Sequence, residues 1–212
     1  SVLILLMFDL SHCHRRRRSR SRRRCSCCVA MSSLFNYAGL GPQSTGASEE
    51  NPPFKLILKD GPFEVRYYPK MVVASAVTKE SDNSLFRTLA GYIFGGNKSE
   101  KRIPMTAPVF MKSKGGQSWM MFFMPSNYTL ESLPKPLNPK VKLGTFHLGK
   151  VAVLRYSGLN PKSKRLEKAK ELLEWTKKKK INVVNNESIS AGYDSPWTFP
   201  WNRRNEVFVS VK

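Results

Sequence analysis

The chain has 212 residues, 41% of them hydrophobic, and a formal net charge of +21. This length suits one domain with tails, or one domain of two similar halves, with enough apolar residues for a packed core. No apolar run approaches the roughly 20 residues that a membrane-spanning helix needs, so no membrane span is expected. The basic surplus favours anionic partners such as phosphates, anionic lipids, carboxylate-bearing ligands and nucleic acid.

Residues 1–50 are predicted to form a disordered basic N-terminal region. Eight arginines lie between Arg15 and Arg24 and follow an apolar stretch, the reverse of the order in a secretory signal. The Arg- and Ser-rich, acid-poor composition is typical of an organellar transit peptide. The other interpretations are translated upstream sequence or a fragment boundary, with the natural start at Met31, or a basic tail. We expect a cytoplasmic protein, or a chloroplast or mitochondrial one if residues 1–30 are a transit peptide.

Metal and catalytic motifs carry little signal. All four cysteines lie in the first 28 residues, so the rest of the chain cannot depend on disulfides, which fits a reducing compartment. Cys25-x-x-Cys28 supplies two of the four ligands of a zinc site, and the neighbouring arginines would oppose a dication, so no metal site is expected. The sequence has no His-Glu-x-x-His, no Gly-x-Ser-x-Gly and no complete phosphate loop, and we expect no enzymatic activity.

The first half of the region after Pro52 predicts two strands, a helix and two further strands. Alternating apolar residues indicate strands at 63–68 and 71–78, with a turn at Pro69-Lys70. A helix follows, with Asp82, Asn83 or Ser84 as its cap and Gly95-Gly96 at its end. Its apolar face consists of Leu85, Phe86, Leu89, Tyr92 and Ile93. Strands at 105–111 and 119–124 come next, joined by a turn at 114–117.

The same order recurs about 80 residues later. Strands are predicted at 141–148 and 150–156, then a helix that begins near Asn160-Pro161, then strands at 189–193 and 206–211. The apolar face of this helix consists of Leu166, Ala169, Leu172, Leu173 and Thr176. Two such halves can pair their sheets into a curved sheet or distorted barrel, with both helices outside. The predicted class is therefore α+β.

Five segments resemble one known family in the correct order. Ile103-Pro-Met-Thr-Ala-Pro-Val109 resembles the signature of the SOUL haem-binding protein family. The other four matching segments are Glu64–Tyr68, Gly91–Asn97, Ala191–Asp194 and Arg203–Val207. The resemblance covers about residues 52–212, which we interpret as one SOUL-type haem-binding domain.

The resemblance implies a distorted antiparallel β-barrel made of two βαββ-type halves with two outer helices. It implies non-catalytic, non-covalent binding of haem or a related tetrapyrrole in an apolar cleft, as a carrier or buffer. A related fold occurs in the effector-binding domains of bacterial transcription regulators, so another small apolar ligand is an alternative.

Haem needs an apolar slot, cations for its propionates and an optional axial ligand. Met105 and Met111, with Phe122 and Phe123, are the candidates for a methionine- and aromatic-rich cleft wall, since thioethers pack against flat ligands and can bind iron. For any one of these residues a place in the barrel core is the ordinary alternative.

The remaining candidates are polar. Arg66 and Arg102 are candidate propionate partners, and so is Lys101. Tyr67, with its neighbour Tyr68, could stack on the ligand or bind its iron, and His147 is the one histidine available within the domain. A lone histidine in an alternating strand is usually a surface or core residue, so the axial ligand stays unassigned.

Two other roles follow from surface composition. Charge-driven binding of nucleic acid or an anionic surface would fall steeply with salt, but no aromatic residues interleave with the Arg15–Arg24 block, which makes nucleic acid an unlikely partner. The loop at Trp197–Trp201 or the second helix could bind a protein partner.

Overall fold

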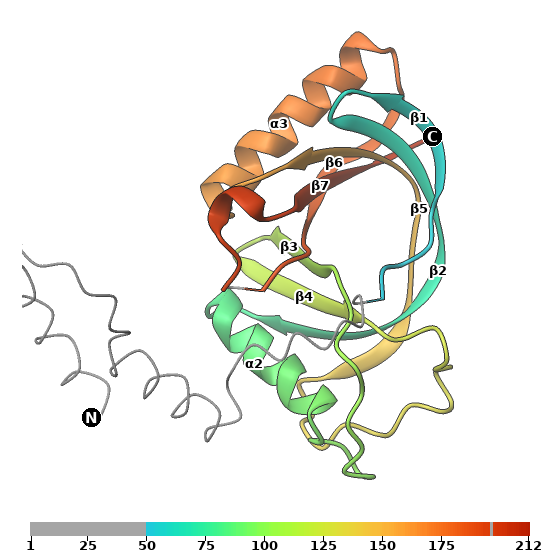
Figure 1. The fold of residues 1–212 in the computed structure, drawn as a ribbon, viewed down its shortest axis with the longest axis vertical. Coiled ribbons are helices and arrows are strands. Elements are labelled where there is room, and N and C mark those ends of the chain that lie inside the picture. Colours follow the sequence, from blue (N-terminus) through green and yellow to red (C-terminus); the bar gives the residue numbers. More distant parts are fainter. Residues whose placement is uncertain (1–49, 196) are drawn as a thin grey trace, which may run out of the picture. The chain divides into compact units, whose positions relative to one another are not determined.

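The computed structural model describes residues 50–195 and 197–212, so the predictions for the basic N-terminal region lie outside the described residues. Figure 1 shows a barrel of curved strands with two long helices on its outside. The elements are β1 (Lys55–Asp60), β2 (Phe63–Thr78), α2 (Asp82–Ile93), β3 (Val109–Lys114), β4 (Gln117–Phe123), β5 (Lys142–Tyr156), α3 (Lys162–Lys178), β6 (Val183–Gly192), the 3-10 turn η1 (Pro200–Asn202) and β7 (Asn205–Val211).

Six of the described strands close an antiparallel barrel in the order β2-β4-β3-β6-β7-β5, and pairing of β2 with β5 completes the ring. β1 is an additional strand that pairs with β2. The sequence interpretation missed β1 because Leu56, Ile57 and Leu58 follow one another without alternation, and all three are exposed in the structure.

The barrel consists of two βαββ halves, as predicted. The first half is β2-α2-β3-β4 and the second is β5-α3-β6-β7. In each half the long first strand pairs with the last one, β2 with β4 and β5 with β7. The halves join through β2 with β5 and through a short β3–β6 pairing at Val109–Met111. The predicted fold class is confirmed.

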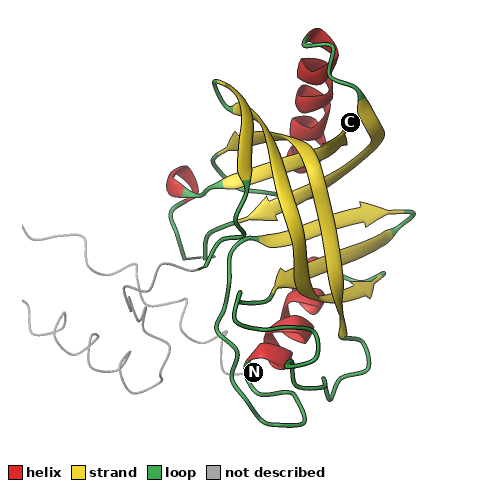
Figure 2. Cartoon of the chain, turned by 90° about the vertical axis from the view of Figure 1, so that its right-hand side faces the viewer, coloured by secondary structure: helices red, strands yellow, loops and turns green. Residues whose placement is uncertain are grey.

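The predicted turn at Pro69-Lys70 is wrong, and so is the predicted break near residue 149. β2 and β5 are continuous strands of 16 and 15 residues that pair along their length. Figure 2 shows them running side by side as the two longest ribbons of the barrel. Tyr68 and Met71 share the barrel interior although they are three residues apart, so the inward face changes at Pro69-Lys70. Leu148 and Val151 also both face the barrel interior although they are three residues apart, so the inward face of β5 changes near Gly149, whose φ is +67°.

The signature segment is not a strand where the sequence predicted one. β3 begins at Val109 rather than at Met105, because Pro104 and Pro108 lack the N–H that a strand ladder requires. Residues 103–108 instead connect α2 to β3. The hydroxyl of Thr106 donates to the carbonyl of Phe123 at 2.6 Å and fixes this connection against β4. The predicted turn between the third and fourth strands is confirmed, with Gly115 and Gly116 both at positive φ.

Two helix details differ from prediction. The N-cap of α2 is Ser81, whose hydroxyl accepts from the N–H of Ser84, and none of the three predicted caps takes that role. On α3, Leu166 is 52% exposed rather than part of the buried face. Trp175 is buried in its place, stacked on Phe63 with 5.0 Å between ring centroids. None of the described helices is long and apolar enough to span a membrane.

The core has three parts, which follow from the strand periodicity. The apolar face of α2 packs on the outside of β2 and β4, and that of α3 packs on the outside of β5 and β7. The third part fills the barrel interior around Phe110, Met121 and Phe208. The outer face of β3 and β4, between the two helices, therefore holds side chains that neither helix covers fully.

Candidate functional site

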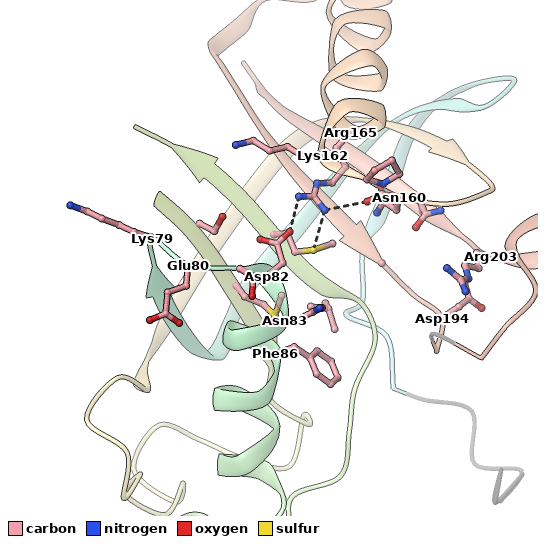
Figure 3. Close-up of a pocket in the computed structure, with 18 of the residues that line it drawn as sticks. Lys79, Glu80, Asp82, Asn83, Phe86, Asn160, Lys162, Arg165, Asp194 and Arg203 are labelled. Atoms are coloured by element: carbon pink, nitrogen blue, oxygen red, sulfur yellow. Dashed lines mark hydrogen bonds and ion pairs between the residues drawn. The ribbon is translucent and has the colours of Figure 1, made fainter. Parts of the chain in front are cut away.

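A groove of about 730 Å³ lies on this outer face, between the N-terminal ends of α2 and α3. Ligand sites in proteins usually measure roughly 300–1,000 Å³. Figure 3 shows residues of both helices facing one another across the groove. The residues used below are Lys79, Glu80, Asp82, Phe86, Val109, Met111, Met120, Lys162, Arg165, Gly192, Asp194 and Arg203.

The floor of the groove is apolar. Val109 and Met111 of β3 point outward beside Met120 of β4, because alternate residues of a strand face opposite sides. Phe86 of α2 borders the floor, and its ring lies 5.5 Å from the ring of buried Phe122. A flat apolar ligand would meet thioethers and an aromatic ring here.

Arg165 links the two halves across the groove. Its Nη2 lies 2.8 Å from Oδ2 of Asp82, and its Nη1 lies 3.2 Å from the carbonyl oxygen of Asn160 and 3.7 Å from the sulfur of Met111. The side chain of Arg165 is 12% exposed and that of Asp82 is 36% exposed. Asp82 sits in the first turn of α2, where the helix dipole favours a negative charge. Figure 3 marks this ion pair with a dashed line between the start of α2 and the start of α3.

The rim of the groove carries both signs of charge. The groove is lined by Lys79, Lys162, Arg165 and Arg203 and also by Glu80, Asp82 and Asp194. Within the described part of the chain, no histidine, cysteine or tyrosine lines the groove, so the sulfur atoms of Met111 and Met120 are its soft donors. Such a set fits a flat apolar ligand with carboxylates at its edge, and its iron-binding chemistry would be that of thioethers.

A second polar cluster lies inside the barrel around Glu206, whose side chain is fully buried. Arg66 donates to its two carboxylate oxygens at 2.8 and 3.1 Å, and Tyr193 donates at 2.7 Å. Arg204 donates at 2.7 and 3.0 Å. The five hydrogen bonds leave little capacity for a ligand, so this cluster is structural.

The pKa shifts in the cluster follow from burial and charge. Burial alone would raise the pKa of Glu206, but the hydrogen bonds and charge of Arg66 outweigh it and hold the pKa below the usual range. Burial alone would lower the pKa of Arg66, but the hydrogen bonds to Glu206 and the negative charge of Glu206 outweigh burial and raise this pKa above its ordinary value. Burial, with the neighbouring Glu206 carboxylate, raises the pKa of Tyr193. Glu206 is therefore ionised, and Arg66 and Arg204 both stay charged.

A family profile described as SOUL heme-binding protein matches residues 49–210. The chain belongs to the SOUL haem-binding protein family. A relative of known name is human Heme-binding protein 2, which is 26% identical over 190 residues, spanning 82% of this chain and 92% of the relative.

Solved structures share the SOUL-type fold at low sequence identity. An uncharacterized conserved protein from Listeria innocua has a TM-score of 0.52 at 13% identity, over 84% of this chain and 98% of its own. A hydrolase from the same organism has a TM-score of 0.51 at 12% identity, over 71% and 91%. The C-terminal domain of EcmrR has a TM-score of 0.52 at 10% identity, over 75% and 98%. These likenesses concern the fold.

Of the residues that the sequence singled out for the SOUL ligand, Met111 lines the groove. Phe122 is buried beneath Phe86 and does not line the groove. Met105 packs against the core under α2, and Phe123 borders a separate depression of about 220 Å³. The structure thus divides the predicted wall of methionine and aromatic residues between two places.

The polar candidates lie elsewhere. Arg66 is buried in the barrel with Glu206, and Tyr68 is buried beside it. Tyr67 and His147 are exposed neighbours on β2 and β5, with 6.4 Å between their ring centroids. Arg102 is exposed and lies in a bridge opposite Phe94, at the end of α2. None of these residues lines the groove as described.

The sequence interpretation missed several groove residues. Phe86 was assigned to the buried face of a helix, and it lies at the edge of that face. Arg165, Lys162 and Asp82 gave no individual signal, since charged residues near a helix start are usually solvated. The available signal was the concentration of basic residues in the first turns of the second helix.

Proposed function

We propose that this SOUL-family protein binds haem or a related tetrapyrrole non-covalently in the groove between α2 and α3, and acts as a carrier or buffer. Family membership supports the ligand class. The name of the human relative, Heme-binding protein 2, supports the same class. The observation that carries the location is an apolar floor, with Met111, Met120 and Phe86, beneath a rim that holds four cations.

Each part of the groove has a distinct task in this proposal. The floor takes the apolar face of the ring, while Arg165, Lys162 and Arg203 are the donors for carboxylates at its edge. Bound haem would bring an iron that accepts a soft ligand, and the sulfur atoms of Met111 and Met120 are the candidates. The sulfur of Met111 also accepts a hydrogen bond from Arg165, so movement of Arg165 would free this sulfur.

A carrier role asks nothing beyond binding and release. The charged rim is partly exposed at Asp82, whose side chain is 36% exposed, which suits exchange of the ligand with other molecules. The buried carboxylate of Glu206 inside the barrel is engaged by five hydrogen bonds and lies away from the groove floor. These features favour storage or transfer of a tetrapyrrole over its conversion.

Titration of the full chain with haemin tests the proposal. A shifted Soret band should saturate near one equivalent, and a titration that matches a protein-free blank would refute haem binding. The location is tested by Gly192→Leu, because a Cβ at Gly192 would face the terminal methyl of Met111 at 3.9 Å and add bulk to the groove. Gly144→Leu is the matched control, since a Cβ there has no neighbour within 4 Å.

The two variants separate ligand from location. We expect Gly192→Leu to weaken haemin binding strongly and Gly144→Leu to bind as the wild-type chain does. Equal binding by both variants would show that haem occupies another part of the protein.

A further inference from the structure

Four large apolar side chains project into solvent beside the groove. Leu159 is 62% exposed, Trp197 92%, Phe199 62% and Trp201 70%. We call these four residues, three of them aromatic, the aromatic knob. Figure 2 shows η1, which contains Trp201, standing out from the barrel wall away from both helices. Exposed apolar groups of this size in one place usually mark an interaction surface.

Hydrogen bonds hold the knob in this shape. The N–H of Gly158 donates to the carbonyl of Pro200 at 2.9 Å, which joins the loop of Leu159 to η1. Asn205 donates from its side chain to the carbonyl of Gly158 at 2.9 Å. The rings of Phe199 and Trp201 stack with 4.9 Å between centroids and 7° between planes. These contacts fix the positions of Leu159, Phe199 and Trp201 relative to one another.

Basic residues lie near the knob along the chain. α3 begins three residues after Leu159, and its first turn carries Lys162, Lys164 and Arg165 and no acidic residue. Arg203 follows η1 directly, and its Nε donates to the carbonyl of Thr198 at 2.8 Å, so its charge stays next to the knob. An apolar tip with cations around its base suits an interface that is apolar inside and anionic at its surface.

We propose that the aromatic knob docks the protein on an anionic lipid surface by inserting into the interfacial region. Trp and Phe combine an apolar ring with low conformational cost, and the indole N–H of Trp finds partners at the headgroup level. Protein-binding hot spots instead sit inside a ring of neighbouring side chains that exclude water. Trp197, at 92% exposure, has almost no such ring, so its partner must surround it from all sides.

Docking would bring the groove to the lipid. Asn160, Asp194 and Arg203 line the groove, and the same residues flank the knob along the chain. A flat apolar ligand partitions into membranes, so insertion of the knob would place the groove rim where such a ligand is concentrated. The lipid interaction goes beyond tetrapyrrole binding and does not depend on it.

Tryptophan fluorescence of the full chain with vesicles tests the proposal. The vesicles are phosphatidylcholine alone, or mixed with phosphatidylserine, with and without bromine-labelled acyl chains that quench inserted Trp. We expect a blue shift and quenching with the anionic vesicles. Trp197→Ala/Trp201→Ala should abolish both signals and weaken partition about tenfold or more, while haemin binding without vesicles stays unchanged.

Two controls make the result specific. Phe94→Ala removes a side chain of matching exposure, 63%, from the far end of α2 and should leave partition unchanged. Arg15–Arg24 can hold the chain to anionic vesicles by charge alone, but that binding falls at high salt and brings no Trp quenching. Absence of quenching, equal loss in the Phe94 variant, or a change of oligomeric state on removing the two tryptophans would each overturn the proposal.

Discussion

The ion pair between Asp82 and Arg165 should compete with the ligand for the groove. Asp82 places a carboxylate on Arg165 at 2.8 Å, in the position that a ligand carboxylate would need. Replacing Asp82 with Asn keeps the size of the side chain and removes its charge. Binding of haemin to Asp82→Asn should therefore be tighter than binding to the wild-type chain, and Arg165→Gln should bind more weakly.

The magnitudes follow from the exposure of the pair. The side chains of Arg165 and Asp82 are 12% and 36% exposed, so solvent partly screens their ion pair. Breaking a screened ion pair of this kind costs about 0.5–1 kcal/mol. Removing that cost in Asp82→Asn should strengthen binding about two- to fivefold. Loss of one hydrogen bond between Arg165 and a charged ligand group costs roughly 1.5 kcal/mol, or about tenfold in Kd.

The assay compares haemin with a porphyrin dimethyl ester, which has no free carboxylate. Both substitutions should change haemin affinity in opposite directions and leave the ester nearly unaffected. Arg87→Gln is the control, because Arg87 is an exposed cation of α2 that does not line the groove. The reasoning is refuted if Asp82→Asn binds haemin more weakly, or if the ester responds to Arg165→Gln as strongly as haemin does.

Three further predictions concern the barrel. Glu206→Gln removes the buried carboxylate that Arg66 and Arg204 share but leaves Arg66 with Glu64 at 2.6 Å, so chemical denaturation should show a loss of about 3 kcal/mol, the low end for a broken buried ion pair. The partly exposed control Glu187→Gln should lose clearly less stability. The pKa of Glu206 is lower in the folded state than in the unfolded state. The stability that ionised Glu206 contributes is therefore complete above the unfolded pKa and is lost as pH falls through the folded pKa. The difference in free energy of unfolding between wild type and Glu206→Gln should narrow below about pH 4. His147→Ala should leave the Soret position unchanged, because His147 is exposed beside Tyr67 and does not line the groove; a shifted band would place it at the iron.

The order of strands and helices was predictable because each element has its own periodicity. Strand alternation located β4 and β7 closely, and the 3.6-residue pattern located α2. The strand continuity of β2 and β5 was not predictable, since Pro69 and Gly149 are residues that normally signal turns. In the barrel these positions change which side chains face inward without interrupting the pairing.

The candidate site was less accessible to sequence reasoning, because its parts come from distant positions. Arg66 stands in an alternating strand, where a cation is usually solvated, and only the fold places it against Glu206, 140 residues later. Asp82 and Arg165 are 83 residues apart and belong to different halves. Single-sequence patterns describe faces of elements, whereas an ion pair across a groove depends on how the elements are assembled.

The position of the groove follows from the duplicated architecture. In each βαββ half the helix begins beside the short β3–β6 pairing, so the N-terminal ends of α2 and α3 meet over the same seam. Both ends carry the positive part of a helix dipole, and α3 adds Lys162 and Arg165. The seam therefore favours carboxylates, and Asp82 occupies part of it. Because each half supplies one wall, a site for a flat anionic ligand arises without any contiguous binding motif.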